Sequence, residues 1–116
     1  VKEMVRSGQL PDGIVCYNDQ IAVQVIETLE GCGVKVPEDV SVTGYDNSLY
    51  AQRGSGITTI AHPQEKLGEM AAELILEKIN GVPEEESRVE RLIRPELIVR
   101  GSCKKKNNNN INKKYN

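Results

Sequence analysis

The chain has 116 residues, a formal net charge of −2, 38% hydrophobic residues, and neither Phe nor Trp. Its length suits one small domain or part of a larger one. The charge is uneven, because residues 104–116 hold five lysines and no acid, whereas residues 1–103 hold 10 basic and 17 acidic side chains. A body this acidic is a poor match for a nucleic-acid backbone, which requires clustered Lys and Arg. We therefore expect that residues 1–102 form a domain that does not itself bind nucleic acid, and that residues 103–116 form a disordered Lys/Asn-rich tail.

The cysteines and the hydrophobic runs exclude several classes of site. Cys16, Cys32 and Cys103 are odd in number and lack the close spacing of a zinc site. Reduced thiols in a cytoplasmic protein are the default interpretation, with no metal and no cofactor. No apolar run approaches the ~20 residues that span a bilayer, so no membrane partner is expected. The chain begins at Val1 with what resembles a helix already under way, and we interpret it as a C-terminal fragment of a longer protein.

The first half of the chain predicts a strand, a helix and a second strand. Residues 13–17 form a short apolar run after a Pro-Asp-Gly turn. Asn18 can cap the following helix through its side-chain oxygen, and glycines at 31 and 33 end that helix. Residues 40–45 then read as the second strand. The helix carries one apolar face at helical spacing, made of Ile21, Ala22, Val25, Ile26 and Leu29.

The second half continues the alternation. A loop with short helix-compatible pieces at residues 47–56 leads to a third strand at residues 57–60. Pro63 suits the first position of a long helix. Beyond it, residues 88–93 and 97–100 are expected to be extended. The long helix has an apolar stripe that we expect to be buried, consisting of Leu67, Met70, Ala71, Leu74, Ile75 and Ile79.

This order of elements predicts an α/β fold with a parallel sheet and flanking helices. Strands that alternate with helices are joined by right-handed crossovers in a parallel sheet. The run Ile14-Val15-Cys16 is apolar at every position. Such runs are typical of strands that are covered on both faces, so we expect helices on both sides of the sheet.

A polar signal follows each of the three predicted strands. Asn18 follows the first, Asp46 the second and His62 the third. If the strands are parallel neighbours, these side chains lie along one carboxyl edge, where open α/β sheets bind small ligands. An ionised carboxylate accepts hydrogen bonds from two hydroxyl groups, while an amide and a neutral imidazole each offer a donor and an acceptor. The set therefore suits an uncharged polyol such as a sugar.

Structural roles compete with this interpretation. Asn18 and His62 occupy positions where helix caps occur, and Asp46 opens a turn. Catalysis has weaker support, because no nucleophile motif and no glycine-rich phosphate loop accompany His62 and Asp46. We therefore predict a binding protein and not an enzyme, with a small α/β enzyme as the rival that turnover of a sugar would reveal.

Three blocks of the sequence resemble the end of the LacI/GalR family of bacterial transcription regulators. The blocks are residues 11–22, with Pro-Asp-Gly and Cys-Tyr-Asn-Asp, residues 33–46, which lead through Val-Pro-Glu-Asp to Gly-Tyr-Asp, and residues 97–102, which end in Arg-Gly-Ser. The resemblance covers residues 1–102 in the family's order and spacing. His62, where most members carry Gln, and Asn47, where most carry a second Asp, look more like the arabinose-responsive (AraR) subgroup.

The resemblance implies a sugar sensor built as the C-terminal lobe of a type I periplasmic-binding-protein-like domain. Asn18, Asp46 and His62 match positions at or near the family's sugar, which binds between two lobes. The sugar, with L-arabinose as the first candidate, would modulate operator DNA binding by an N-terminal domain that is missing from this segment. A periplasmic sugar-binding protein of a transporter is the alternative. The family also implies a homodimer with Val23, Tyr50 and Arg53 facing the partner, although Val23 could equally be ordinary core.

Overall fold

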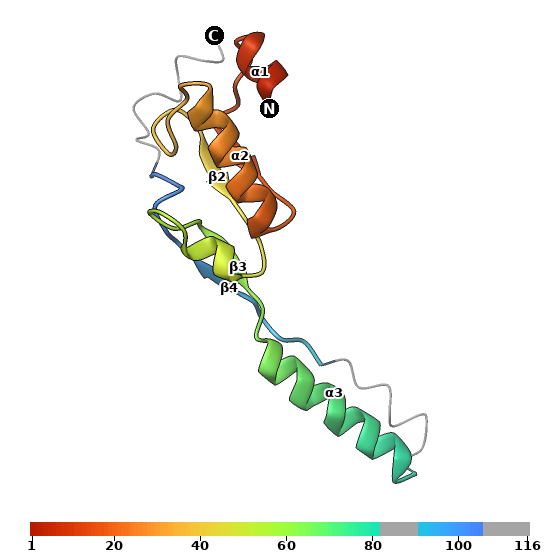
Figure 1. The fold of residues 1–116 in the computed structure, drawn as a ribbon. Helices are drawn as coiled ribbons and strands as arrows, with labels where there is room; N and C mark the ends of the chain where they lie inside the picture. Colours follow the sequence, from red (N-terminus) through yellow and green to blue (C-terminus); the bar gives the residue numbers. More distant parts are fainter. Residues whose placement is uncertain (82–90, 106–116) are drawn as a thin grey trace, which may run out of the picture.

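The computed structural model describes residues 1–81 and 91–105. Figure 1 shows a body in which α2 lies beside the strands, and a separate arm in which α3 projects away from that body. In chain order the elements are α1 (Lys2–Arg6), β1 (Gly13–Val15), α2 (Asp19–Gly31), β2 (Ser41–Thr43), the 3₁₀ turn η1 (Leu49–Gln52), β3 (Thr59–Ala61), α3 (Gln64–Ile79) and β4 (Glu96–Ile98).

The three predicted strands lie side by side and run the same way. β1 pairs with β2 in parallel, with Ile14 opposite Val42. A parallel bridge between Thr43 and Thr58 pairs β2 with the segment that leads into β3. The amide of Asp46 then donates to the carbonyl of Ile60 at 2.9 Å, which extends the same pairing into β3. The predicted α/β class and parallel arrangement are therefore confirmed, and β4 adds an antiparallel partner for β3.

The hydrophobic core lies between α2 and one face of this sheet. It contains only aliphatic residues and one cysteine, as expected for a chain without Phe or Trp. Leu29, Val40 and Val42 are fully buried, and burial of each such side chain stabilises the fold by about 1.5–3 kcal/mol. Of the face predicted for α2, Ala22 and Leu29 are buried, whereas Ile21 remains 40% exposed.

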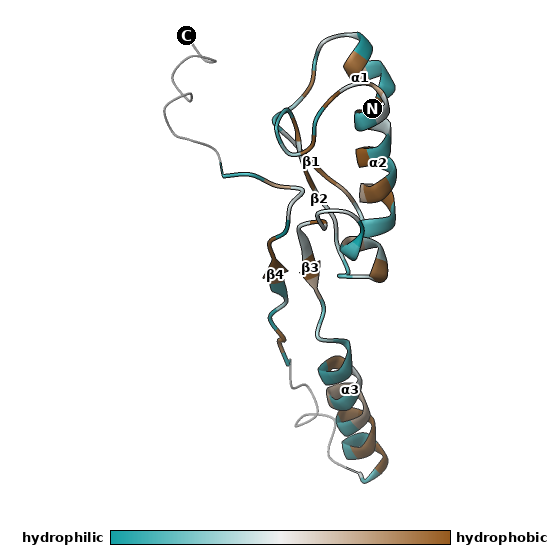
Figure 2. Ribbon diagram, turned by 60° about the vertical axis from the view of Figure 1, so that its left-hand side comes forward, coloured by the Kyte–Doolittle hydropathy of each residue, from teal (hydrophilic) through white to brown (hydrophobic). Residues whose placement is uncertain are grey.

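The expectation that both faces of the strands are covered is wrong. Val15 is 86% exposed, and Tyr17, just after β1, is 85% exposed. The reason is that α2 packs on one face only, and none of the described helices covers the opposite face (Figure 2). An apolar residue at every position of a strand thus predicts two covered faces. In the described part of this chain, no element covers the second face.

The predicted burial of the α3 stripe is also wrong. α3 forms where the periodicity predicts it, yet it has no buried residue, and Ile75 and Ile79 are 58% and 73% exposed. Figure 2 shows hydrophobic residues, in brown, along this projecting helix. Two ion pairs connect it to the returning chain, because the guanidinium of Arg91 lies 2.8 Å from Glu73 and 2.9 Å from Glu77.

Several boundaries differ from the predicted ones. Each strand has three residues, shorter than predicted, and α3 begins after Pro63, with that proline as its N-cap. Residues 91–95 have no regular structure, while the expectations for residues 82–90 and for 106–116 of the tail lie outside the described residues. Near the end of the described residues, the Ser102 hydroxyl donates to the Val42 carbonyl at 2.6 Å and ties this segment to β2. Among the described helices, none has the length and hydrophobicity needed to cross a membrane.

Candidate functional site

The carboxyl ends of the three parallel strands border one open hollow of about 530 Å³, here called the rim hollow. Its lining residues directly follow β1, β2 and β3, and are Cys16, Tyr17, Tyr45, Asp46 and His62. Asp46 and His62 also line an adjoining hollow of about 630 Å³, which reaches the first turn of α3. The sequence prediction that polar groups gather at this edge therefore holds for Asp46 and His62.

Asp46 and His62 face each other without a direct hydrogen bond. The Nε2 atom of His62 lies 3.8 Å from Oδ1 of Asp46, which is longer than a hydrogen bond. The side chains of His62 and Asp46 are 31% and 48% exposed, so both keep their capacity to bind a ligand. Tyr45 contacts the imidazole edge to face, with ring centroids 4.7 Å apart. The arrangement can receive the hydroxyl groups of a small polar molecule.

Asn18 occupies the same end of the sheet but has a structural role as well. Its Oδ1 accepts a hydrogen bond from the amide of Ile21 at 2.9 Å, so that Asn18 is the N-cap of α2. This bond uses one of the two lone pairs of the oxygen. The rim hollow is lined by the preceding residue, Tyr17, and not by Asn18. The structure thus brings Asp46 and His62 together and leaves Asn18 at the helix cap beside them.

The turn that carries Asp46 has a strained backbone. Asp46 and Asn47 both have positive φ angles, 95° and 51°. Such conformations cost of order 1–3 kcal/mol each for residues other than glycine and persist where the surroundings hold them. Here Arg100 holds the turn from the far end of the chain, because its guanidinium donates to Oδ1 of Asn47 at 2.7 Å and to the carbonyl of Ile57 at 2.9 Å.

Three residues of the rim hollow are not identified by the sequence pattern. Cys16, Tyr17 and Tyr45 fall within predicted strands and read as packing residues, although each stands within two positions of a predicted site residue. Their closeness in sequence to Asn18 or Asp46 is the one signal that could have identified them as site residues. Burial raises the pKa of the Cys16 thiol, so this group stays protonated at neutral pH and presents a small apolar surface to the hollow.

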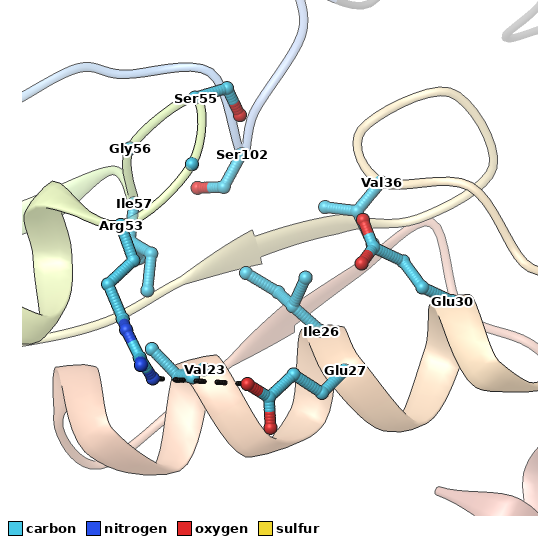
Figure 3. Close-up of a pocket in the computed structure, with 11 residues that line it drawn as sticks. Val23, Ile26, Glu27, Glu30, Val36, Arg53, Ser55, Gly56, Ile57 and Ser102 are labelled. Atoms are coloured by element: carbon cyan, nitrogen blue, oxygen red, sulfur yellow. Dashed lines mark ion pairs between the residues drawn. The ribbon is translucent and has the colours of Figure 1, made fainter.

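A third hollow, of about 240 Å³, lies between α2 and the loop after η1 (Figure 3). Its floor is apolar and includes Val23, which is 9% exposed and belongs to the chain's own core. At its rim Arg53 lies 3.9 Å from Glu27, and both side chains are about two-thirds exposed. Tyr50, 44% exposed on η1, does not line this hollow. Of the three residues expected to face a partner, two therefore meet here and the third lies outside.

Comparisons with known proteins agree with this architecture. The periplasmic binding protein-like domain family matches residues 1–103. The arabinose metabolism transcriptional repressor of Geobacillus stearothermophilus is 37% identical over 99 residues, covering 81% of this chain and 26% of that protein. The HTH-type transcriptional repressor PurR of Vibrio parahaemolyticus is 41% identical over 98 residues, covering 84% and 29%. The chain thus spans less than a third of these relatives.

Solved structures give the same result. The transcriptional regulator CelR in complex with cellobiose has a TM-score of 0.74 at 30% identity, covering 85% of this chain and 30% of that one. The lac repressor dimer bound to operator and the anti-inducer ONPF has a TM-score of 0.74 at 25% identity, covering 87% and 35%. The chain belongs to the periplasmic binding protein-like domain family, and within it to the effector-binding domains of LacI/GalR transcriptional regulators.

Proposed function

We propose that the rim hollow is the effector site and that its effector is a sugar, with L-arabinose as the first candidate. The observation that carries the proposal is the meeting of Asp46 and His62 at the carboxyl edge of the parallel strands, 3.8 Å apart and both partly exposed. Asp46 would accept hydrogen bonds from two adjacent hydroxyls, and His62 would offer a donor and an acceptor. Tyr17 and Tyr45 would supply flat apolar surface for the carbon face of a sugar ring.

The choice of L-arabinose depends on a relative and on the site's chemistry. The Geobacillus stearothermophilus relative is a repressor of arabinose metabolism. CelR is seen with cellobiose, and a LacI-family regulator of Lactobacillus casei with sucrose, so related domains hold neutral sugars of different size. The PurR relatives match this chain at a similar sequence identity but are a different regulator. The test therefore compares several effectors.

The rest of the proposal concerns the longer protein in which this segment would work. The effector would bind between this lobe and a second one, and would shift the balance between two lobe arrangements. A separate domain would contact operator DNA, since residues 1–103 are acidic. The protein would act in the cytoplasm as a homodimer, with Val23, Tyr50 and Arg53 at or beside the partner face. No catalytic step is included.

The direct test is effector binding by the full-length protein and its Asp46→Ala variant. Calorimetry with L-arabinose, cellobiose and sucrose should give a micromolar dissociation constant for L-arabinose. Removing the Asp46 carboxylate should weaken it at least 100-fold, because hydrogen bonds to a charged group contribute about 1.5–3 kcal/mol each.

Operator binding provides the internal control for this experiment. Asp46→Ala should retain operator binding and lose release by sugar. Unchanged sugar affinity in the variant would remove Asp46 from the site. Sugar binding without any operator binding would favour the alternative of a periplasmic binding protein that serves a transporter.

A further inference from the structure

Asp19 is a fully buried acidic residue that the proposed effector site does not use. Its relative exposure is 0%, although it lies in the first turn of α2, next to the capping Asn18. Its carboxylate accepts three hydrogen bonds: from the Thr59 hydroxyl at 2.6 Å, from the Ser48 amide at 2.7 Å and from the Ser48 hydroxyl at 3.1 Å. A carboxylate taken out of water is tolerated when it is satisfied in this way.

These hydrogen bonds converge on the strained turn that presents Asp46. Ser48 is the residue after Asn47, so Asp19 fixes the chain immediately beyond the two positive φ angles. Thr59 continues the network, because its hydroxyl oxygen accepts from the Asn47 amide at 3.3 Å while its hydrogen goes to Asp19. Two successive amides after Asp46 are therefore held by one buried pair, Asp19 and Thr59.

The fold makes specific room for this contact. A Cβ added at Gly44 would lie 2.2 Å from Oδ1 of Asp19, so only glycine lets the carboxylate cross the end of β2. The backbone of Asp19 is also tied to this strand end, since its amide donates to the Tyr45 carbonyl at 3.0 Å. Asp19 thus links α2 to the chain on both sides of Asp46.

We propose that Asp19 is a positioning residue, which with Thr59 holds the Asp46–Ser48 turn in the conformation that presents the Asp46 carboxylate to the effector. This inference rests on the proposed function, because it assumes that Asp46 binds the effector. A purely stabilising role would have a different consequence. Loss of Asp19 would then lower the stability of the protein, but each folded molecule would still bind effector with unchanged affinity.

The experiment separates hydrogen bonding from packing with a pair of variants at one position. In the full-length protein, Thr59→Val keeps the shape of the buried side chain and removes the hydroxyl, whereas Thr59→Ser keeps the hydroxyl and removes a methyl group. Asp19→Asn is the direct variant. Val40→Ala is the matched control for lost stability, because Val40 is fully buried just before β2, at the end of the strand opposite Asp46.

Three readouts are taken on each variant: the dissociation constant for L-arabinose by calorimetry, the exchange rates of the Asn47 and Ser48 amides by NMR, and the free energy of unfolding by denaturant titration. We expect at least 10-fold weaker binding for Asp19→Asn and Thr59→Val, and within 2-fold of wild type for Thr59→Ser and Val40→Ala. Exchange at Asn47 and Ser48 should rise at least 10-fold in the first two variants only.

The outcomes distinguish the two proposals. A wild-type protein that binds no sugar contradicts the proposed function, and the exchange rates then still decide whether Asp19 holds the turn. A wild-type protein that binds sugar, with Thr59→Val as tight as Thr59→Ser, contradicts the positioning role. That role is equally contradicted if affinity declines in proportion to stability across all four variants, Val40→Ala included. If Asp19→Asn fails to fold, the Thr59 pair gives the answer alone.

Discussion

The helices α2 and α3 have similar sequence patterns and opposite environments. α2 and α3 both carry apolar residues at helical spacing, but α2 packs against the sheet and buries Ala22, Val23 and Leu29, whereas α3 has no buried residue. The difference lies in what each helix meets. α2 is followed within ten residues by a strand that returns beneath it, while α3 leaves the body entirely (Figure 1). Amphipathic periodicity thus predicts a helix, but burial depends on a partner that the pattern does not specify.

The largest expected effect contrasts one leucine of the body with one isoleucine of the arm. In this chain, Leu29→Ala should lower the free energy of unfolding by about 2–5 kcal/mol, because Leu29 is fully buried. Ile75→Ala should change it by less than about 0.5 kcal/mol, because Ile75 is 58% exposed. Denaturant unfolding followed by circular dichroism measures both. Equal losses would show that α3 is covered in solution and would contradict the contrast between the two helices.

Two glycine substitutions should have opposite signs. Gly44→Ala should destabilise the body by about 1–3 kcal/mol, because the new methyl group would overlap the Asp19 carboxylate. Gly68→Ala, in α3, should stabilise the chain by about 0.5–1 kcal/mol, because nothing beyond the neighbouring helix backbone lies within 4 Å of the added Cβ and alanine favours the helix. Thermal unfolding of the two variants and of the wild type shows whether each substitution lowers or raises stability. A destabilising Gly68→Ala would mean that α3 packs against something there.

The smallest effect concerns the ion pairs of the arm. Arg91 bridges Glu73 and Glu77, and its side chain is 26% exposed. Exposed pairs contribute about 0.2–1 kcal/mol, so Arg91→Ala should raise amide exchange in the last turns of α3 and leave the body unaffected. Arg94→Ala, at an exposed position, is the control. Faster exchange in α2 as well would show that arm and body are coupled more closely than their contacts indicate.

The sequence was enough to predict much of the proposed effector site. Asp46 and His62 follow predicted strands, and parallel neighbours must end at the same edge, so their meeting could be inferred without coordinates. The capping position of Asn18 was equally visible, because the helix start lies directly after it. These inferences succeeded because each depends on residues close in sequence and on a single rule of sheet topology.

The contacts that hold the Asp46 turn were decided by tertiary structure. Asp19 meets a hydroxyl 40 residues away, and Arg100 meets Asn47 across 53 residues. Nothing in the local pattern distinguishes Asp19, a helix-start acid that would ordinarily face water, from a residue at 0% exposure. Likewise Val15 and the α3 stripe are apolar in sequence and exposed in the structure. Local propensity and periodicity determined which elements form, while burial and hydrogen-bond partners depended on which elements come together, because a side chain gains from leaving water only where another surface closes over it.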